Sequence, residues 1–267
     1  MSAELPNDSW WGDYALEPDE TARWEIGPLR FWLHRSSLEW RLTYEWDGDE
    51  NRLGWSHAAA VQWPGQDVET ERFALSETTG GVRLRPLPSD RPVVARPKTS
   101  LRVLPGQRAR VFMSSPLWVE ISAGAVPTSL LELPAKRLSE TWFGATTREG
   151  ALSYALKTSA RTDLAVMPRA QYRLLTPVVI ENQASDPLLL ERLSLPVPYL
   201  TIYRAKNGEA WSNEVRMLRT ESGDMAALDV RGGPPAEAEG ASRLSEPREK
   251  ISQGQIFRAF GSLLGFD

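Results

Sequence analysis

The chain has 267 residues, of which 41% are apolar and 25% charged, and this composition excludes a collagen, a coiled coil and a wholly disordered protein. Its 31 Lys and Arg residues against 35 Asp and Glu residues leave a formal charge of −4, which provides no electrostatic footprint for nucleic acid. Cysteine is absent, so disulfides, thiolate zinc sites, iron–sulfur clusters and cysteine nucleophiles are excluded.

The beginning of the chain predicts a cytoplasmic location. Residues 1–8 carry acids and a proline where a secretory signal needs a basic segment followed by an apolar run. No stretch approaches the roughly 18 consecutive apolar residues of a membrane-spanning helix. His34 and His57 are the two histidines, so a three-histidine metal centre is excluded, and we expect both to be structural. We expect no metal and no cofactor.

Apolar and polar residues alternate strictly in the segment 38–46, which is the clearest such pattern in the chain. One predicted face carries Leu38, Trp40, Leu42, Tyr44 and Trp46, and the other carries Glu39, Arg41, Thr43 and Glu45. A half-buried antiparallel strand has this pattern, and the Asp47-Gly48 pair that follows favours a hairpin turn. The return strand is predicted at residues 52–61. With another apolar strand at residues 29–35, residues 24–63 are expected to form a meander.

Short strands divided by Pro, Gly and Asn are predicted along most of the remaining chain. They are expected at residues 82–85, 101–103, 109–113, 117–121, 150–158, 172–175, 178–181, 188–195 and 199–204. The Asn207-Gly208 pair predicts a hairpin from the last of these to a return strand containing Trp211 and Val215. The pattern Leu-x-Val-x-Pro at residues 101–105 recurs at 164–168, which indicates either a duplicated unit or chance recurrence among 20 prolines.

These elements predict an all-β fold, built as an antiparallel β-sandwich with one large or two smaller units of immunoglobulin-like or jelly-roll-like type. The proline-rich loop 86–97 is the candidate boundary, because proline cannot donate to a sheet ladder. The expected organisation is a Trp-rich sandwich half at 1–90, a second sandwich unit at 97–222, a flexible linker at 223–249 and an amphipathic tail helix at 250–267.

The linker is predicted from composition, and the tail helix is predicted from the period of its apolar residues. Residues 223–249 are rich in Gly, Pro, Ala, Glu and Ser, which bury too little apolar area to offset the entropy of ordering. On a helical wheel, one arc of about 120° carries Ile256, Phe257, Phe260, Leu263 and Leu264. This stripe is predicted to pack on a partner or a second copy, on the chain's own body, or on a membrane surface. Its few basic residues argue against the membrane.

Two clusters are candidates for ligand contact. Eight of the 11 tryptophans fall within the first 63 residues. They form a filled core, which we favour, a surface for a partner, or a stacking platform for a sugar or base with Trp10, Trp11, Trp32 and Trp55 as its exposed members. The segment 137–144 follows neither the two-residue period of a strand nor the 3.6-residue period of a helix. Arg137, Glu140 and Trp142 line a pocket there, or the segment is a crossover anchored in the core by Trp142 and Phe143, which we favour.

Catalytic signals are weak. Carboxylates that qualify for a glycosidase pair are Glu25, Glu39, Glu45, Glu140 and Asp163, but Glu39 and Glu45 lie on the polar side of an alternating strand, where solvated charge is ordinary. The Gly-x-Ser-x-Gly nucleophile elbow, the dinucleotide-binding glycine pattern and the P-loop pattern do not occur. We therefore assign no catalytic residue.

Several segments resemble an uncharacterised prokaryotic family known only as a domain of unknown function. They are Trp10-Trp11-Gly12, Gly27-Pro28-Leu29, and the runs at residues 137–144, 150–158 and 193–200. The resemblance covers residues 10 to about 220 and leaves the predicted linker and tail outside. It implies a cytosolic bacterial or archaeal protein without an assigned reaction, and it transfers no catalytic residue.

Two functional hypotheses follow. The first is a non-enzymatic interaction or adaptor module whose tail helix docks on a protein partner or a second copy. It predicts that deletion of residues 224–267 leaves a folded body that no longer associates. The second is a carbohydrate-binding or carbohydrate-processing protein that uses the amino-terminal tryptophans, and it predicts a change in tryptophan fluorescence with oligosaccharides. Neither hypothesis involves nucleic acid.

Overall fold

The computed structural model describes residues 9–47, 52–75, 77–146, 148–252 and 255–261. The predicted all-β class is confirmed, since strands dominate and no α-helix occurs in these ranges. Three short 3-10 helices are present: η1 Leu164–Val166, η2 Val197–Tyr199 and η3 Ala236–Ala238. Within the described ranges, no helix has the length and apolar character needed to cross a membrane.

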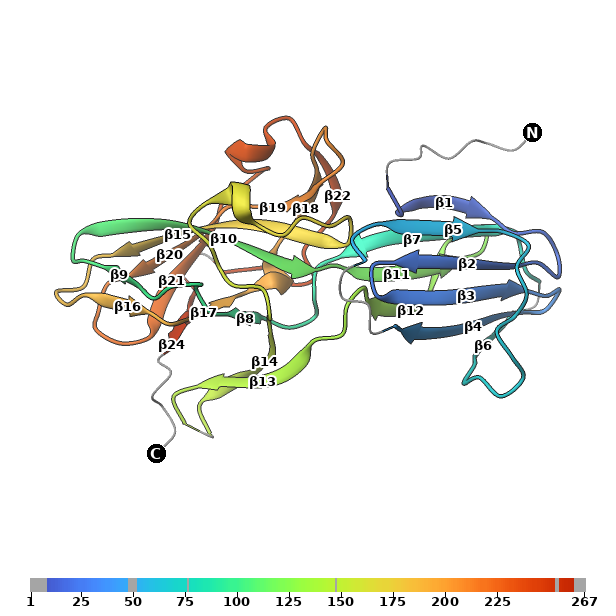
Figure 1. Ribbon diagram of the computed structural model, residues 1–267, viewed down its shortest axis with the longest axis horizontal. Helices are drawn as coiled ribbons and strands as arrows, with labels where there is room; N and C mark the ends of the chain where they lie inside the picture. Colours follow the sequence, from blue (N-terminus) through green and yellow to red (C-terminus); the bar gives the residue numbers. More distant parts are fainter. Residues whose placement is uncertain (1–8, 48–51, 76, 147, 253–254, 262–267) are drawn as a thin grey trace. The chain divides into compact units, whose positions relative to one another are not determined.

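The chain divides into two compact units, and each is assembled from separate stretches of sequence (Figure 1). Unit 1 comprises residues 1–87, 116–137 and 170–172, and unit 2 comprises residues 88–115, 138–169 and 173–267. One passage between the units lies between Leu87 and Pro88, inside the proline-rich loop predicted as a boundary. The predicted organisation into consecutive blocks is wrong in one respect, because residues 116–137 and 170–172 return to unit 1.

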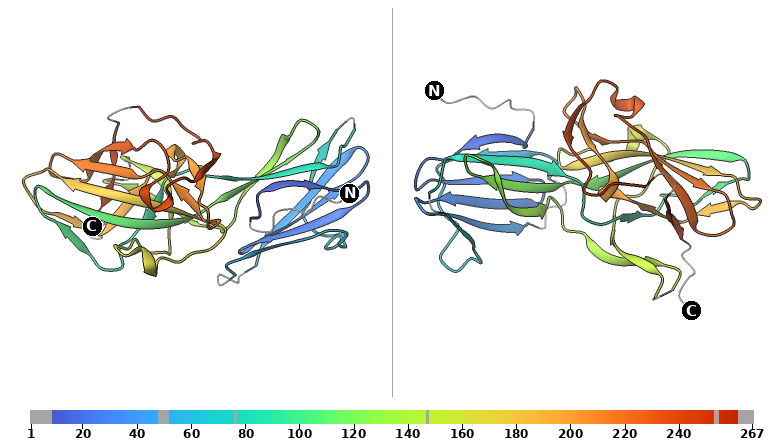
Figure 2. Two further views of the ribbon diagram at one scale, coloured as in Figure 1. Left: turned by 90° about the horizontal axis from the view of Figure 1, so that it is seen from above. Right: turned by 180° about the vertical axis from the view of Figure 1, so that it is seen from behind.

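Unit 1 contains a four-stranded and a five-stranded sheet. The four-stranded sheet has the order β1-β7-β11-β12, with β1 Gly12–Ala15, β7 Gly81–Leu87, β11 Trp118–Ala123 and β12 Thr128–Pro134. The five-stranded sheet has the order β5-β2-β3-β4-β6, with β5 Trp55–Ala58, β2 Thr21–Ile26, β3 Leu29–Arg35, β4 Glu39–Trp46 and β6 Glu71–Ala74. Figure 2 shows them as two layers, and Tyr14 of one sheet meets Trp24 of the other edge to face at 5.2 Å.

The β2–β3–β4 meander follows the alternation of its sequence. Trp40 and Leu42 of β4 are fully buried, as predicted, while Tyr44 and Trp46 are half-buried and Leu38 is exposed. The β2–β3 turn requires a glycine, because Gly27 has a φ of +55° and the ring of Tyr172 packs directly against its Cα. This close contact joins the last short stretch of unit 1 to its first hairpin.

The predicted return strand after Asp47-Gly48 is wrong in its partner. Strand β5 pairs with β2, through Trp24 opposite His57, and not with β4. The free edge of β4 is instead covered by β6, with Trp40 opposite Phe73. Local turn chemistry favours adjacent pairing, but β5 gains its ladder and the ring contact between Trp24 and His57 at the opposite edge of the sheet.

Unit 2 contains an eight-stranded sheet, a five-stranded sheet and a pair. The eight-stranded sheet has the order β22-β18-β19-β15-β20-β21-β23, and β10 also pairs with β15; the strands are β22 Ser242–Ser245, β18 Ile202–Arg204, β19 Ala210–Ser212, β15 Arg173–Asn182, β20 Val215–Arg219, β21 Met225–Val230, β23 Ile256–Arg258 and β10 Gln107–Pro116. The five-stranded sheet has the order β13-β14-β8-β17-β24, with β13 Ser139–Gly144, β14 Gly150–Ala155, β8 Val93–Ala95, β17 Arg192–Leu195 and β24 Phe260–Gly261. The pair is β16 Leu188–Leu190 with β9 Leu101–Val103.

The sheets of unit 2 are mixed, which corrects the expectation of a purely antiparallel fold. Strand β15 runs parallel to both β19 and β20, and β14 runs parallel to β8. The predicted Asn207-Gly208 hairpin is confirmed, with Tyr203 opposite Trp211 and Gly208 at a φ of +82°. The Leu-x-Val-x-Pro recurrence is no structural duplication, since residues 101–103 form a strand and 164–166 a 3-10 helix. The immunoglobulin-like or jelly-roll-like type stays a prediction.

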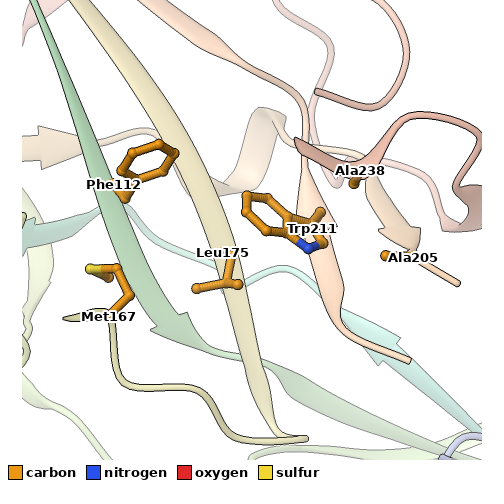
Figure 3. Close-up of a cluster of buried hydrophobic side chains, with 6 residues drawn as sticks. All are labelled: Phe112, Met167, Leu175, Ala205, Trp211 and Ala238. Atoms are coloured by element: carbon orange, nitrogen blue, oxygen red, sulfur yellow. The ribbon is translucent and has the colours of Figure 1, made fainter. Parts of the chain in front are cut away.

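One core cluster of unit 2 gathers around Trp211 and draws on segments that are far apart in sequence (Figure 3). Its buried members are Phe112, Met167, Leu175, Ala205, Trp211 and Ala238. Ala238 belongs to the segment predicted as a flexible linker, and that prediction is wrong: residues 223–249 contain β21, η3 and β22. The amide of buried Asn213 donates to the carbonyls of Arg231 and Gly233, so the glycine-rich turn is held from within.

The predicted tail helix is also wrong. Residues 256–258 form β23 on β21, and Phe260 is fully buried where β24 pairs with β17. A short helix with two glycines is marginal alone, whereas the edges of two sheets offer unpaired backbone groups and a buried position for one aromatic ring. The described part of the tail therefore packs on the chain's own body, one of the predicted alternatives. Leu263 and Leu264 lie outside the described residues.

Candidate functional site

The amino-terminal tryptophans are mainly core residues. Trp10 and Trp32 are buried, so the prediction that they are exposed stacking residues is wrong, and Trp11 and Trp55 are half-buried. The Trp10 indole donates to the carbonyl of Gln171 at 3.0 Å and meets Trp11 edge to face at 5.3 Å. Trp24 is fully buried and meets Tyr14 of the facing sheet, so it fills space between the two sheets of unit 1, as the favoured interpretation expected.

His57 belongs to the same aromatic packing. Its ring lies 4.7 Å from that of Trp24 and 5.0 Å from that of Tyr14. Burial lowers the pKa of His57 and raises the pKa of Tyr14 to about 12. The cluster therefore keeps both groups neutral at pH 7, and we interpret it as structural.

The candidate carboxylates are largely neutralised by arginines. Arg30 donates to Glu25 at 3.1 Å and to Glu45 at 2.7 Å. Glu39 accepts from Arg41 and Arg72, and these hydrogen bonds lower its pKa. A glycosidase acid needs a raised pKa, so this outer face of the sheet is better explained as a solvated charge network. Asp163 instead accepts from the backbone N–H of Ala165 at 2.8 Å.

The segment around Trp142 begins with a passage from unit 1 to unit 2, as the favoured crossover interpretation predicted, and then forms a β-hairpin. Strands β13 and β14 pair antiparallel from Ser139 opposite Ala155 to Gly144 opposite Gly150, and only Tyr154 and Ala155 continue the pairing onto β8. The outer part of the hairpin therefore extends beyond the end of β8 (Figure 1). The chain enters unit 2 just before it, between Arg137 and Leu138. Arg137 itself lies in unit 1, with its guanidinium 5.1 Å from the ring of Trp46.

One face of the hairpin presents an exposed tryptophan. The Trp142 ring covers the Gly144–Gly150 pair so closely that a Cβ at either glycine falls within 2.8 Å of it. Its indole N–H donates to the carbonyl of Thr146 at 2.7 Å, and the side chain stays 37% exposed. The glycines thus provide a flat seat for the ring, which holds it in one orientation.

Charged and apolar groups surround this tryptophan on the same face. Leu152 lies directly opposite Trp142, and Tyr154 lies opposite Glu140. Arg91 forms an ion pair with Glu140 at 2.5 Å, and its guanidinium lies 5.4 Å from the centre of the Tyr154 ring. Of the residues predicted to line a pocket, Glu140 and Trp142 are therefore brought together, on an open face.

The opposite face of the hairpin covers a pocket of about 360 Å³, which we call the hairpin pocket. Its lining consists of Pro92, Phe143, Glu149, Gly150, Ala151, Ser194, Pro196, Tyr199, Met225, Leu228, Gln255, Phe257 and Arg258. Phe143 is anchored by Arg192, whose guanidinium lies 5.1 Å from the ring centre, and Gly261 leaves the space that the ring occupies. Pockets of this size and largely apolar lining commonly bind small molecules or side chains.

Two polar groups of the hairpin pocket are held by neighbours. Arg258 donates to Asp224 at 3.1 Å, and the Gln255 amide donates to the Tyr199 hydroxyl at 3.4 Å. Neither arrangement places a nucleophile beside a base, which acid–base or covalent catalysis requires.

Sequence reasoning found part of this site. Phe257 lines the pocket and Ile256 is 66% exposed, whereas Phe260 is buried, so the predicted tail stripe is split between three environments. Met225 and Leu228 were missed because they lie in the segment predicted as a linker. Their signal was the alternating run that precedes Arg231, in which Ala226 and Leu228 are buried while Met225 and Asp229 are exposed.

A family model described as "Protein of unknown function (DUF432)" matches residues 10–264. The match extends past residue 220 and includes the predicted linker and all but the last three residues of the predicted tail, which the sequence resemblance left outside. No curated protein and no solved structure matches the chain.

Proposed function

Because this chain belongs to the family DUF432 of proteins of unknown function, we propose its function from geometry: a non-enzymatic interaction module whose hairpin pocket receives an apolar side chain of a protein partner. The observation that carries this proposal is the apolar lining of a preformed pocket beneath an extended hairpin. Anchoring of this kind concentrates binding energy in one buried aliphatic or aromatic group.

The surroundings of the pocket support a protein partner. Met225 on its rim is 43% exposed, although it belongs to a strand inside the sheet order. Strand β13 is an edge strand, so its outward backbone groups can extend hydrogen bonding to an added strand. Glu149 and Arg258 give the rim one charge of each sign, which orients a peptide without requiring a strongly charged one.

The test is a peptide-display selection against the full chain, followed by measured affinities. We expect the selected peptides to share one Phe, Leu, Ile or Met anchor and to bind Met225→Lys at least tenfold more weakly than the wild type. Ile256→Lys is the matched control, because Ile256 is exposed and lies outside the pocket lining. Peptides without a shared anchor, or equal binding to Met225→Lys, would contradict the proposal.

A carbohydrate-binding function is the second candidate, now placed on the hairpin instead of the amino-terminal tryptophans. The specific observation is the Trp142 ring, seated on two glycines and flanked by the Arg91–Glu140 pair. Sugars stack on such rings and take hydrogen bonds from charged groups beside them. An oligosaccharide titration should change the tryptophan fluorescence of the wild type and of Trp55→Leu, but not of Trp142→Leu. A response unaffected by Trp142→Leu would exclude this site.

A further inference from the structure

A second pocket of unit 2, separate in its lining from the hairpin pocket, has a different chemistry. It measures about 320 Å³ and is lined by Pro97, Lys98, Thr99, Ser100, Leu101, Val111, Ala160, Arg161, Thr162, Asp163 and Val166. Two cations, three hydroxyl groups and one carboxylate are thus gathered around an apolar wall. We call it the cationic pocket.

The backbone brings the two cations together. Pro97 and Ala160 form an isolated parallel bridge, and Lys98 and Arg161 follow them directly in sequence. The Lys98 N–H donates to the carbonyl of Ala160 at 3.2 Å. Arg161 is fixed on its other side by a two-way bridge with Phe112, at 2.7 and 3.0 Å. Because these contacts are backbone hydrogen bonds, the backbone positions from which the two cations extend are fixed before any ligand arrives.

The Arg161 side chain has an unmet hydrogen-bonding requirement. Its Nε is buried, yet no acceptor contacts it among the residues that the structure describes. A buried arginine Nε ordinarily has an acceptor. Arg173 of the same unit is an example, since its Nε donates to the Ser114 hydroxyl at 2.7 Å. A buried donor without an acceptor is unfavourable, and an oxyanion that enters the pocket would supply the missing acceptor.

The charge pattern points the same way. Most arginines of the described ranges are in ion pairs with a carboxylate, for example Arg91, Arg110 and Arg219. Neither Lys98 nor Arg161 has such a pair within those ranges, although Asp163 lines the same pocket and caps η1 instead. Two free cations match the roughly −1.5 to −2 charge of a phosphate monoester better than the single charge of a carboxylate.

We propose that the cationic pocket binds a small organic phosphate that carries hydroxyl groups, with its phosphate held between Lys98 and Arg161. Arg161 donates to the phosphate through Nε and its terminal nitrogens, and the hydroxyl side chains of Thr99, Ser100 and Thr162 supply further donors. The free oxygen of Asp163 accepts from a ligand hydroxyl. The body of the ligand lies against Leu101, Val111 and Val166. This binding site is independent of the proposed hairpin pocket.

Calorimetric titration of the full chain at constant ionic strength tests the proposal, with inorganic phosphate, glycerol 3-phosphate and glycerol as probes. We expect saturable binding of both phosphates, with glycerol 3-phosphate the tighter, and no binding of glycerol. Arg161→Gln should weaken phosphate binding at least tenfold. Arg102→Gln is the matched control, since it removes the same charge from an exposed residue outside the pocket lining, and should change binding less than twofold.

Exposed Lys98 provides a second variant that does not depend on the folding of Arg161→Gln. Lys98→Met should weaken phosphate binding severalfold while the thermal unfolding temperature stays unchanged. Three results overturn the proposal: no saturable binding of either phosphate, equal weakening by Arg102→Gln and Lys98→Met, or glycerol binding as tightly as glycerol 3-phosphate. A peptide-binding defect in Met225→Lys leaves this site untouched, so the failure of one proposal is distinguishable from the failure of the other.

Discussion

Replacing Gly27 by alanine tests the contact that closes unit 1. A Cβ added to Gly27 would lie 2.5 Å from Cε1 and 3.0 Å from Cγ of Tyr172, and closer still to Cδ1. Tyr172 is 2% exposed, so its ring cannot turn into solvent. Gly27 also has a φ of +55°, a left-handed conformation that costs a residue with a side chain about 1–2 kcal/mol.

The expected loss of stability is the sum of two contributions. Overpacking of a well-filled core costs about 1–3 kcal/mol, which with the backbone contribution gives about 2–5 kcal/mol for Gly27→Ala. Gly106→Ala is the control, because Gly106 has a similar φ of +71° but no atom within 4 Å of the position that an added Cβ would take. It should cost only the backbone part, about 1–2 kcal/mol.

Guanidinium unfolding followed by far-ultraviolet circular dichroism measures both variants, since this signal reads the strands of both units. The comparison is made on whichever transition each variant shifts, in case the two units unfold separately. If Gly27→Ala costs no more than Gly106→Ala, the Tyr172 ring does not pack tightly on the β2–β3 turn, and the reasoning about this contact is wrong.

Three other perturbations have defined outcomes. Burial lowers the pKa of His57 in the folded chain, so the unfolded chain takes up the proton of this imidazole at a higher pH. The free energy of unfolding should therefore be highest above about pH 6.5 and decrease as the pH falls through the folded-state pKa of His57. Unfolding curves of His57→Gln should show a smaller decrease over this pH range. Asn182→Ala removes the four hydrogen bonds that the buried Asn182 amide makes with Val103, Ala184, Asp186 and Arg219, and should cost about 1–3 kcal/mol in denaturant unfolding. Exposed Asn207→Ala should cost under about 1 kcal/mol. Deletion of residues 224–267 removes β21, β22, β23 and β24, so unit 2 should lose its cooperative unfolding transition. A folded truncated body would contradict the sheet order of this unit.

Local signals in the sequence predicted the elements that local forces decide. The alternation around Trp40 and Leu42 indicated a strand with the correct buried face, and the Asn207-Gly208 pair indicated a hairpin with the correct partners. In both cases the turn and the strand period act on residues that are neighbours in sequence, so no distant segment was needed to decide the outcome.

Segments whose pairing depends on distant strands were not predictable in the same way. Strand β5 follows a favourable hairpin dipeptide, yet it lies beside β2 at the other edge of the sheet. The tail around Phe260 has a helical period but pairs with β17 and β21, which are visible only in the assembled fold. Tertiary contacts outweighed weak local preference at each of these places.

The candidate site shows the same division. Trp142 and Glu140 were identified because they interrupt both periods, but the glycine pair beneath the ring appears only when Gly144 and Gly150 are paired. The cationic pocket had no sequence signal, because Lys98 and Arg161 are 63 positions apart and are brought together by an isolated bridge between the residues that precede them, Pro97 and Ala160. A site that is assembled by bridges between distant loops cannot be predicted from hydrophobic periodicity or from sequence motifs alone.

The alternation of the chain between the two units has a consequence for its synthesis. Unit 1 needs residues 170–172, and Tyr172 packs against Gly27 close to the start of the chain. A growing polypeptide therefore holds an incomplete first unit until more than half of its length has left the ribosome, while stretches of the second unit are already outside. Neither unit can be cut out of the gene as one uninterrupted piece, because each is encoded in three separate stretches.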